Sequence, residues 1–215
     1  MGYFKRSRNT KRFIIDKEVK EKHKHLNYKI RKQVKPIPVK PDLDEIMESS
    51  MNGVKTMIYK AYTDGGCDLN SRHGSWAYCI TLNNKIIKED SGFERQTTNN
   101  RMEATALIKC LETLIKDNSS ASIYLDSELV VKTFNLWMHK WKKHGWSRNK
   151  HKQVEVKNLD LVMQLDSLKS QIKNKISVEW IKGHSGIFFN EHVDDLCSIQ
   201  INKNKTYDSL KPMTL

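Results

Sequence analysis

With 215 residues, 38% of them hydrophobic and 29% charged, the chain is long enough for one ordinary domain plus an extension. No run of about 18 apolar residues occurs, which excludes a membrane-spanning helix, and the four cysteines form no C-x-x-C pair, which argues against a zinc site. The formal net charge of +13 suits a polyanionic partner such as nucleic acid, although a solvated tail and a soluble helix face would give the same balance.

Residues 1–56 have little apolar periodicity and are strongly basic. Residues 1–40 hold fourteen Lys and Arg against three acids, and prolines recur over residues 35–41, as is typical of a linker. We therefore expect a basic, flexible N-terminal extension, a folded domain over residues 57–203 and a C-terminal tail over residues 204–215. The start of the chain lacks the apolar segment of a secretory signal. We expect an intracellular, cytoplasmic location, or a nuclear or mitochondrial one if the source is eukaryotic.

The first predicted strand begins at Ile58 and is an apolar run that ends in Asp64, where a tight turn at Asp64-Gly65-Gly66 is expected to close it. A carboxylate at the end of a buried strand either bonds to the backbone of the turn or binds a cation, because an isolated buried charge is unfavourable. Two more strands, Ser75–Leu82 and Lys85–Phe93, follow across a turn at Asn83-Asn84. Three successive strands predict an antiparallel meander.

A helical pattern begins at Asn99, and one face of it carries a carboxylate followed by apolar residues. The positions on this face are Glu103, Leu107, Cys110, Leu111 and Leu114. Glu103 therefore lies at the N-terminal end of a face that points to the core. It is about as well placed to be the capping-box partner of Asn100, three residues earlier.

A second strand that ends in a carboxylate is predicted at Ser122–Asp126. The elements predicted after it are helices over residues 127–143 and 158–172, a strand over 176–181, and a loop at Gly183-His184-Ser185-Gly186. Asn190 is expected to cap a final helix whose Val193, Leu196 and Cys197 pack inward. The order βββαβααβα predicts an α/β fold.

Asp64 and Asp126 end two strands joined by a helical crossover, and such strands are parallel when they share a sheet. Their ends then meet at the edge where open α/β sheets bind ligands, and Glu103 faces the same region. Either Asp194 or Asp195 of the final helix supplies a fourth acid, and the pattern does not decide between them. Carboxylates this close repel one another unless a cation lies between them, so the sequence predicts bound Mg²⁺ or Mn²⁺.

Several of these residues also have a purely structural interpretation. Asp126 can cap the helix that starts at Ser127, and His184 can be an ordinary loop residue. Trp137 and Trp141 lie four residues apart among lysines, where they can pack against the core or line a groove for a nucleic-acid backbone. Singly these interpretations compete well, whereas the acids taken together favour a cation site.

Six motifs follow one another along residues 57–203. They are Tyr62-Thr63-Asp64-Gly65-Gly66, Thr97-Thr98-Asn99-Asn100-Arg101-Met102-Glu103, Leu125-Asp126-Ser127, Trp137-x-x-x-Trp141-Lys142-Lys143-x-Gly145-Trp146, Val156-Lys157-Asn158-x-Asp160-Leu161, and Trp180-x-Lys182-Gly183-His184-Ser185-Gly186 with Asn190-Glu191 and Asp194. This set resembles type 1 ribonuclease H of the bacterial kind. The resemblance implies a ribonuclease H-like fold, with a five-stranded mixed sheet of order 3-2-1-4-5 flanked by helices. It also implies endonucleolytic hydrolysis of the RNA strand of RNA/DNA hybrids.

The resemblance further implies roles for the matching residues. Four residues match the metal-binding catalytic carboxylates of the family: Asp64, Glu103, Asp126 and Asp194. In the family these carboxylates hold two Mg²⁺ ions, for which Mn²⁺ can substitute. His184 matches a mobile histidine that assists proton transfer or product release. The residues that match substrate contacts are Asn70, Asn99 and Asn100 for the minor groove, Thr98 for a DNA phosphate, and Trp137, Trp141, Lys142, Lys143 and Trp146 for the DNA strand. The implied partner is an RNA/DNA hybrid duplex, and we expect a monomer that does not bind membranes.

Two departures from the family pattern concern substrate binding. Asp68-Leu69 lie in a loop that lacks the glycine and proline often found there, and Gln96 stands where many relatives have arginine, which predicts a weaker DNA phosphate pocket. The Gly65-Gly66 pair is expected to leave room for a substrate backbone. Two other functions stay open, namely a catalytically silent nucleic-acid-binding module of this fold and the detached ribonuclease H domain of a reverse transcriptase.

Overall fold

The computed structural model describes residues 58–209 of the chain. The predicted extension over residues 1–56 and the last residues of the predicted tail, 210–215, lie outside this part. Among the helices of residues 58–209, none is both long and apolar enough to cross a membrane.

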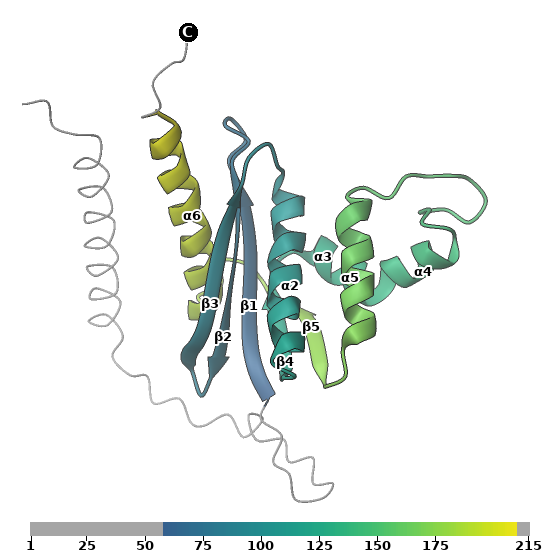
Figure 1. Ribbon diagram of the computed structural model, residues 1–215, viewed down its shortest axis with the longest axis horizontal. Helices are drawn as coiled ribbons and strands as arrows, with labels where there is room; N and C mark the ends of the chain where they lie inside the picture. Colours follow the sequence, from purple (N-terminus) through teal and green to yellow (C-terminus); the bar gives the residue numbers. More distant parts are fainter. Residues whose placement is uncertain (1–57, 210–215) are drawn as a thin grey trace, which may run out of the picture. The chain divides into compact units, whose positions relative to one another are not determined.

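Five strands form one mixed sheet (Figure 1). The strands are β1 (Ile58–Cys67), β2 (Gly74–Leu82), β3 (Lys85–Glu94), β4 (Ser120–Leu125) and β5 (Ile176–Trp180). Their order is β3-β2-β1-β4-β5, with β2 antiparallel to β1 and β3, and β4 parallel to β1 and β5. The predicted α/β fold and its strand order 3-2-1-4-5 are therefore confirmed.

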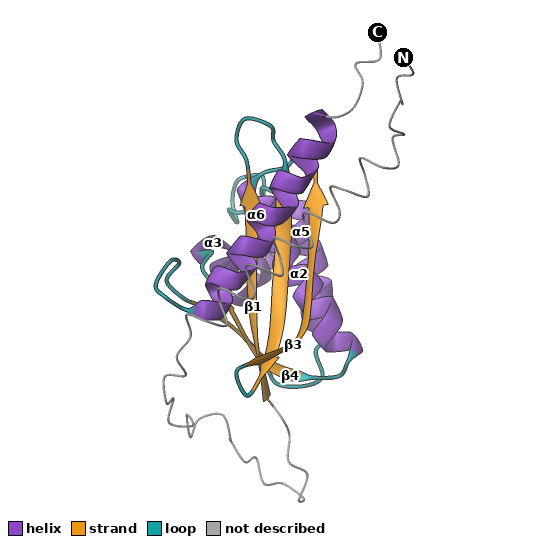
Figure 2. Cartoon of the chain, turned by 90° about the vertical axis from the view of Figure 1, so that its left-hand side faces the viewer, coloured by secondary structure: helices purple, strands orange, loops and turns teal. Residues whose placement is uncertain are grey.

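Helices cover both faces of this sheet. They are α2 (Asn99–Lys116), α3 (Glu128–Lys132), the π-helical segment η2 (Thr133–Trp137), α4 (Met138–Lys143), α5 (Leu159–Gln171) and α6 (Phe188–Ser209). Successive strand residues point to opposite faces, so Ala61 packs on the side of α2 and α5 whereas Tyr62 packs on the side of α6. Figures 1 and 2 show α6 and α2 on opposite sides of the sheet.

The larger core lies between the sheet and helices α2 and α5. Leu107, Leu111 and Leu114 of α2 are at most 1% exposed, so the predicted helix face is the buried one. Each such side chain contributes about 1.5–3 kcal/mol by leaving water. A smaller core beneath α6 contains Val193 and Cys197, as the sequence predicted. The core therefore fixes α2 and α6 on the strands whose ends carry the predicted acids.

The helix predicted over residues 127–143 is interrupted by η2. The Asn135 amide group donates to the carbonyl of Val178 (2.8 Å), and the Lys169 ammonium group donates to the carbonyl of Phe134 (2.7 Å). The bond from Lys169 occupies a carbonyl that a regular α-helix would use internally, which accounts for the wider turn.

The final helix differs from the prediction at both ends. It begins at Phe188, so Asn190 does not cap it but lies in its first turn, where it is 3% exposed. It continues to Ser209, past the predicted limit at residue 203. Lys205, in the added turns, bonds to Asp68 beside β1 (2.7 Å).

Candidate active site

Three carboxylates converge just beyond the point where the pairing of β1 with β4 ends. Tyr62 of β1 pairs with Tyr124 of β4, so Asp64 and Asp126 both follow two residues later on adjacent parallel strands. Glu103 approaches from the early turns of α2. Carboxylate oxygens of Asp64, Glu103 and Asp126 all lie within 4.8 Å of one another. The structure thus brings together the acids that the strand and helix patterns placed at one edge.

Gly65 allows the approach of α2 to β1. A Cβ atom at this position would overlap the backbone of Met102 and Glu103. Gly66 faces α6 instead, where a Cβ would lie in ordinary contact with Cys197 (3.8 Å). The expectation that both glycines leave room for a substrate backbone is therefore wrong for Gly65, whose missing side chain is needed for α2 to bring Glu103 beside Asp64.

Burial makes ionisation of two of these acids unfavourable. Asp64 is 8% exposed and Glu103 is 7% exposed. Burial raises the pKa of Asp64 to about 7; the charge of Asp126 adds to this, and a hydrogen bond from the Gly65 amide (2.7 Å) opposes it. Burial likewise raises the pKa of Glu103 to about 9, with further contributions from Asp64 and Asp126. A nearby positive charge would therefore stabilise the ionised cluster.

The structure excludes the purely structural interpretation for Glu103 and Asp126 but not entirely for Asp64. Thr98, not Asn100, caps α2 by accepting a bond from the Arg101 amide (3.4 Å), so Glu103 is not the partner in a capping box. Ser127 occupies the position before α3, so Asp126 is not its cap residue. The Asp64 carboxylate does accept a bond from the backbone amide of Gly65 (2.7 Å), but β1 continues through both glycines to Cys67, so the predicted turn after Asp64 is wrong.

Asp194 and His184 lie beside the cluster. The imidazole Nδ1 of His184 is 4.0 Å from a carboxylate oxygen of Asp194, and the His184 side chain is 83% exposed. Burial raises the pKa of Asp194, His184 lowers it, and the charges of Asp195 and Asp126 raise it. Asp195 itself is exposed. Of the two neighbouring aspartates, Asp194 is therefore the one whose charge interacts with the cluster.

Two residues that position Asp126 were not recognised as such in the sequence. The indole of Trp180 donates to the Asp126 carbonyl (3.0 Å), and the buried amide group of Asn190 lies 3.5 Å from the Asp126 carboxylate. A Cβ atom on Gly183 would crowd the same carboxylate. Asn190 precedes Asp194 by one helical turn, a spacing that places both on one face and could have marked Asn190 as part of the site.

The donor set suits a hard divalent cation. Glu103 accepts one hydrogen bond, from the Asn99 side chain (3.3 Å), but its other oxygen is buried and has no hydrogen-bond partner among the described residues. A buried carboxylate oxygen of this kind is expected where a cation completes the site. Oxygen ligands favour Mg²⁺ or Mn²⁺ over softer metals. The cluster can therefore bind metal.

Four of the predicted substrate contacts line a groove of about 770 Å³. Thr98 and Asn100, exposed at the start of α2, line one side, and Trp137 and Trp141 line the other. The two indole rings lie 5.8 Å apart. Trp141 also packs against the core, so this tryptophan both lines the groove and contributes to the packing of the fold. The groove thus connects the start of α2 with the basic region around α4.

The remaining predicted contacts lie outside this groove. Asn70 is exposed in the loop between β1 and β2, and Asn99 donates to Glu103. Lys142 forms an ion pair with Asp166 (2.6 Å), whereas Lys143 is exposed. Trp146 packs partly against the core. The structure therefore leaves Asn70 and Lys143 accessible to a partner but gives Trp146 a structural role.

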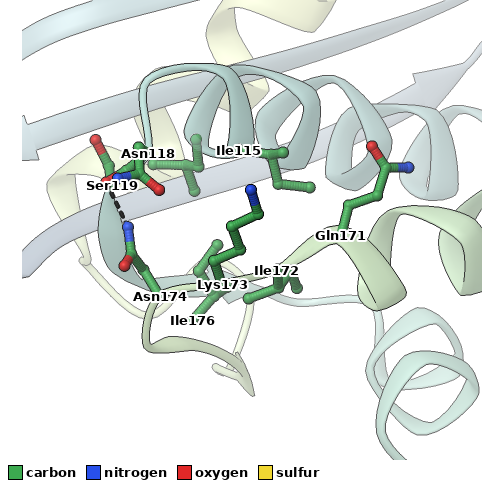
Figure 3. A pocket seen from close by; sticks show the side chains of 9 residues that line it. Ile115, Asn118, Ser119, Gln171, Ile172, Lys173, Asn174 and Ile176 are labelled. Carbon is green, nitrogen blue, oxygen red and sulfur yellow. Dashed lines mark hydrogen bonds between the residues drawn. The ribbon is translucent and has the colours of Figure 1, made fainter.

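A second pocket, of about 410 Å³, lies at the other end of α2 (Figure 3). Its walls include Ile115 of α2 and Ile172 beyond α5, and a hydrogen bond from Asn174 to the carbonyl of Asn118 closes one side. None of the predicted site residues lines it.

Solved structures share this fold. LC9-RNase H1, a type 1 RNase H with the type 2 active-site motif, is 22% identical, with a TM-score of 0.59 over 70% of this chain and 74% of that one. LC11-RNase H1 in complex with an RNA/DNA hybrid is 24% identical, with a TM-score of 0.52 over 68% of this chain and 99% of that one. These structures show that the chain has the ribonuclease H fold.

Sequence similarity narrows the class to one family. The RNase H family model matches residues 55–202. Ribonuclease H of Francisella philomiragia is 44% identical over 138 residues, which cover 64% of this chain and 87% of that protein. The chain belongs to the RNase H family.

Proposed function

We propose that this protein hydrolyses the RNA strand of RNA/DNA hybrids, using two Mg²⁺ ions held by its carboxylates. The observation that carries the proposal is the cluster of Asp64, Glu103 and Asp126, in which Asp64 and Glu103 are buried and one Glu103 oxygen has no hydrogen-bond partner among the described residues. The relatives named Ribonuclease H and the related fold found bound to an RNA/DNA hybrid support it. A catalytically silent module would have no need of three mutually repelling acids, two of them buried.

Four carboxylates would hold the ions, Mg²⁺ or alternatively Mn²⁺: Asp64, Glu103, Asp126 and Asp194. When bound, such ions activate a water molecule for in-line attack and stabilise the charge on the leaving oxygen. The chain supplies the arrangement of the ligands. The Gly65 amide orients Asp64, Asn99 orients Glu103, and Trp180 fixes the backbone of Asp126.

His184 is proposed to move protons or to assist product release. Its imidazole is largely exposed yet lies beside Asp194, so it can exchange a proton with solvent and present it at the edge of the cluster.

Substrate recognition is proposed to use residues that line the groove together with others outside it. Asn70, Asn99 and Asn100 contact the minor groove, where the 2′-hydroxyl distinguishes RNA from DNA, and Thr98 contacts a DNA phosphate. The residues proposed to hold the DNA strand through stacking and charge are Trp137, Trp141, Lys142, Lys143 and Trp146.

A labelled RNA/DNA hybrid tests the function directly. The wild-type chain should cut only the RNA strand with Mg²⁺ and should not cut with EDTA. Asp126→Asn should bind the hybrid without cutting it, whereas Asp195→Asn, an exposed neighbour of Asp194, should cut normally. Binding without cleavage by the wild type would instead identify a silent module, and undiminished turnover by Asp126→Asn would disprove the metal-site assignment.

We also propose that the basic extension over residues 1–56 strengthens binding through phosphate contacts. Deletion of residues 1–55 should weaken hybrid affinity and flatten its dependence on salt, because fewer counterions are released on binding. The turnover number should not change. An unaltered salt titration would leave the extension without a role in binding. The monomeric state and the intracellular location remain predictions.

A further inference from the structure

The loop between β1 and β2, residues 68–73, departs from the family pattern and is closed by its own backbone. The Asp68 amide donates to the carbonyl of His73 (2.8 Å), and the Arg72 amide donates to the carbonyl of Asp68 (2.9 Å). At the tip, Leu69 is 86% exposed and Asn70 is exposed beside it. These two side chains therefore project from a short, internally bonded loop that follows the strand carrying Asp64.

The Asp68 carboxylate connects this loop to the far end of α6. One of its oxygens accepts bonds from the amide (2.8 Å) and the hydroxyl (2.7 Å) of Ser71, and the other accepts a bond from the Lys205 ammonium group (2.7 Å). Lys205, and then Ser71, hold the pKa of Asp68 well below its usual range. The side chains of Asp68 and Lys205 are 25% and 39% exposed, so solvent only partly screens the pair.

The same loop is bonded to the start of α2. The Arg72 guanidinium donates to the carbonyl of Thr97 (3.2 Å), and the Thr97 amide donates to the carbonyl of Arg72 (3.1 Å). Arg72 has a φ of 57°, a left-handed conformation that a residue with a side chain keeps only when its surroundings hold it there. Because Thr97 directly precedes the α2 cap Thr98, the loop links the last turns of α6 to the helix that carries Glu103.

We infer that Lys205 is a positioning residue: through its bond to Asp68 it holds the loop of residues 68–73 so that Leu69 and Asn70 contact the hybrid. The inference rests on the proposed function, in which Asn70 contacts the minor groove. Leu69 adds an apolar surface that can pack on a sugar of the substrate next to the Asn70 contact. Lys205 lies about three helical turns beyond Asp194 and therefore acts on binding rather than on the chemical step.

Kinetics of Lys205→Met test this role, because methionine keeps the apolar stem and removes the charge. We expect KM for the hybrid to rise about two- to fivefold, with kcat unchanged. This fold-change corresponds to the free energy that one partly exposed ion pair contributes. Lys205→Arg should restore KM. Lys203→Met is the matched control, since it removes one exposed lysine from the same helix and tests general charge loss.

Coupling between sites tests whether Lys205 acts through the loop. In a chain that already carries Leu69→Gly and Asn70→Ala, Lys205→Met should raise KM no further. An additive rise, an unchanged KM for Lys205→Met alone, or an equal rise for Lys203→Met would each overturn the inference.

Hydrogen exchange at the Ser71 amide tests the loop without substrate. This amide donates to Asp68, so it should exchange faster in Lys205→Met than in Lys203→Met or the wild type. Failure of the wild type to cut the hybrid would overturn the proposed function. Normal cleavage by the wild type, with KM and Ser71 exchange equal in the two methionine variants, would overturn the inference alone.

Discussion

The acidic cluster and the apolar core behind it are built on the same strands and the same helix, yet they affect stability in opposite directions. Glu103 and Leu107 lie one turn apart on the buried face of α2, at 7% and 0% exposure. Burial of Leu107 favours the folded state. Burial of Glu103 raises its pKa to about 9, so its ionised form disfavours the folded state.

The buried face of α2 therefore has two roles along its length: its N-terminal end carries the site residue Glu103, and the part that follows packs in the core. The leucines fix α2 on the sheet, and Gly65 allows the helix backbone to approach β1 closely enough for Glu103 to meet Asp64. The core therefore maintains an arrangement of acids that would otherwise separate. Substitutions at the two ends of the face should consequently give opposite combinations of activity and stability.

The largest expected effect is the loss of activity in Glu103→Gln. Removal of one metal-binding carboxylate should lower hybrid cleavage about a thousandfold or more, since several kcal/mol of transition-state stabilisation are lost. Steady-state cleavage of a labelled hybrid measures this. Glu112→Gln, on the same helix but paired with Lys109, is the control and should keep wild-type turnover. Comparable activity in both variants would place the chemistry elsewhere.

At the apolar end, Leu107→Ala should lower the free energy of unfolding by about 2–5 kcal/mol, because it removes buried methyl groups and leaves a cavity. Urea denaturation followed by circular dichroism measures the change. Ile87→Ala on β3, where the side chain is 54% exposed, should change stability by less than about 0.5 kcal/mol. The folded fraction of Leu107→Ala should retain hybrid cleavage. An active-site defect in that fraction would show that core and cluster are not separable.

Much of this arrangement was predictable from the sequence, for identifiable reasons. Period-2 and period-3.6 patterns located the strands and the buried face of α2, and the crossover between Asp64 and Asp126 required their strands to be parallel. A local sequence pattern is therefore enough to predict an element when the contacts that stabilise it recur at regular positions along that element.

Contacts between distant segments could not be predicted in this way. The bond from Lys205 to Asp68 joins residues 137 positions apart, and neither residue has a local signal for it. The π-helical turn depends on the bond from Lys169 to the carbonyl of Phe134, which comes from another helix. Asn190 was assigned as a cap from composition, whereas the packing of α6 beside Asp126 places it in the site.

The next effect in size is a pH-dependent gain of stability in Glu103→Gln. Burial raises the pKa of Asp64 from 3.8 to about 7 and that of Glu103 from 4.5 to about 9. Between about pH 5 and pH 7 the unfolded chain has released both protons while the folded chain still binds them, and between about pH 7 and pH 9 the folded chain still binds the Glu103 proton, so the free energy of unfolding falls as pH rises. Glu103→Gln should flatten this slope and gain on the order of 2 kcal/mol at pH 8 without divalent ions.

Urea denaturation at several pH values in EDTA measures this slope, and Mg²⁺ supplies the control. At pH 5 the variant and the wild type should differ little, because Glu103 keeps its proton in the folded wild type. Addition of Mg²⁺ at pH 8 should stabilise the wild type more than the variant, since binding to the folded state favours it. A variant that is less stable than the wild type at pH 8 in EDTA would contradict the view that Glu103 weakens the fold.

The smallest effect concerns a buried polar group that does have a partner. The Tyr78 hydroxyl of β2 is hydrogen-bonded to the Thr113 hydroxyl of α2 (2.8 Å), and Tyr78 is 3% exposed. Tyr78→Phe should lower the free energy of unfolding by about 1 kcal/mol, because Thr113 loses its partner, with hybrid cleavage unchanged. The decrease should be the same from pH 5 to pH 9, unlike the effect of Glu103→Gln. Adding Thr113→Val should recover part of the loss, since neither hydroxyl is then left unpaired. A double variant less stable than Tyr78→Phe alone would contradict this explanation. The loss in Tyr78→Phe would then not come from leaving the Thr113 hydroxyl without a partner.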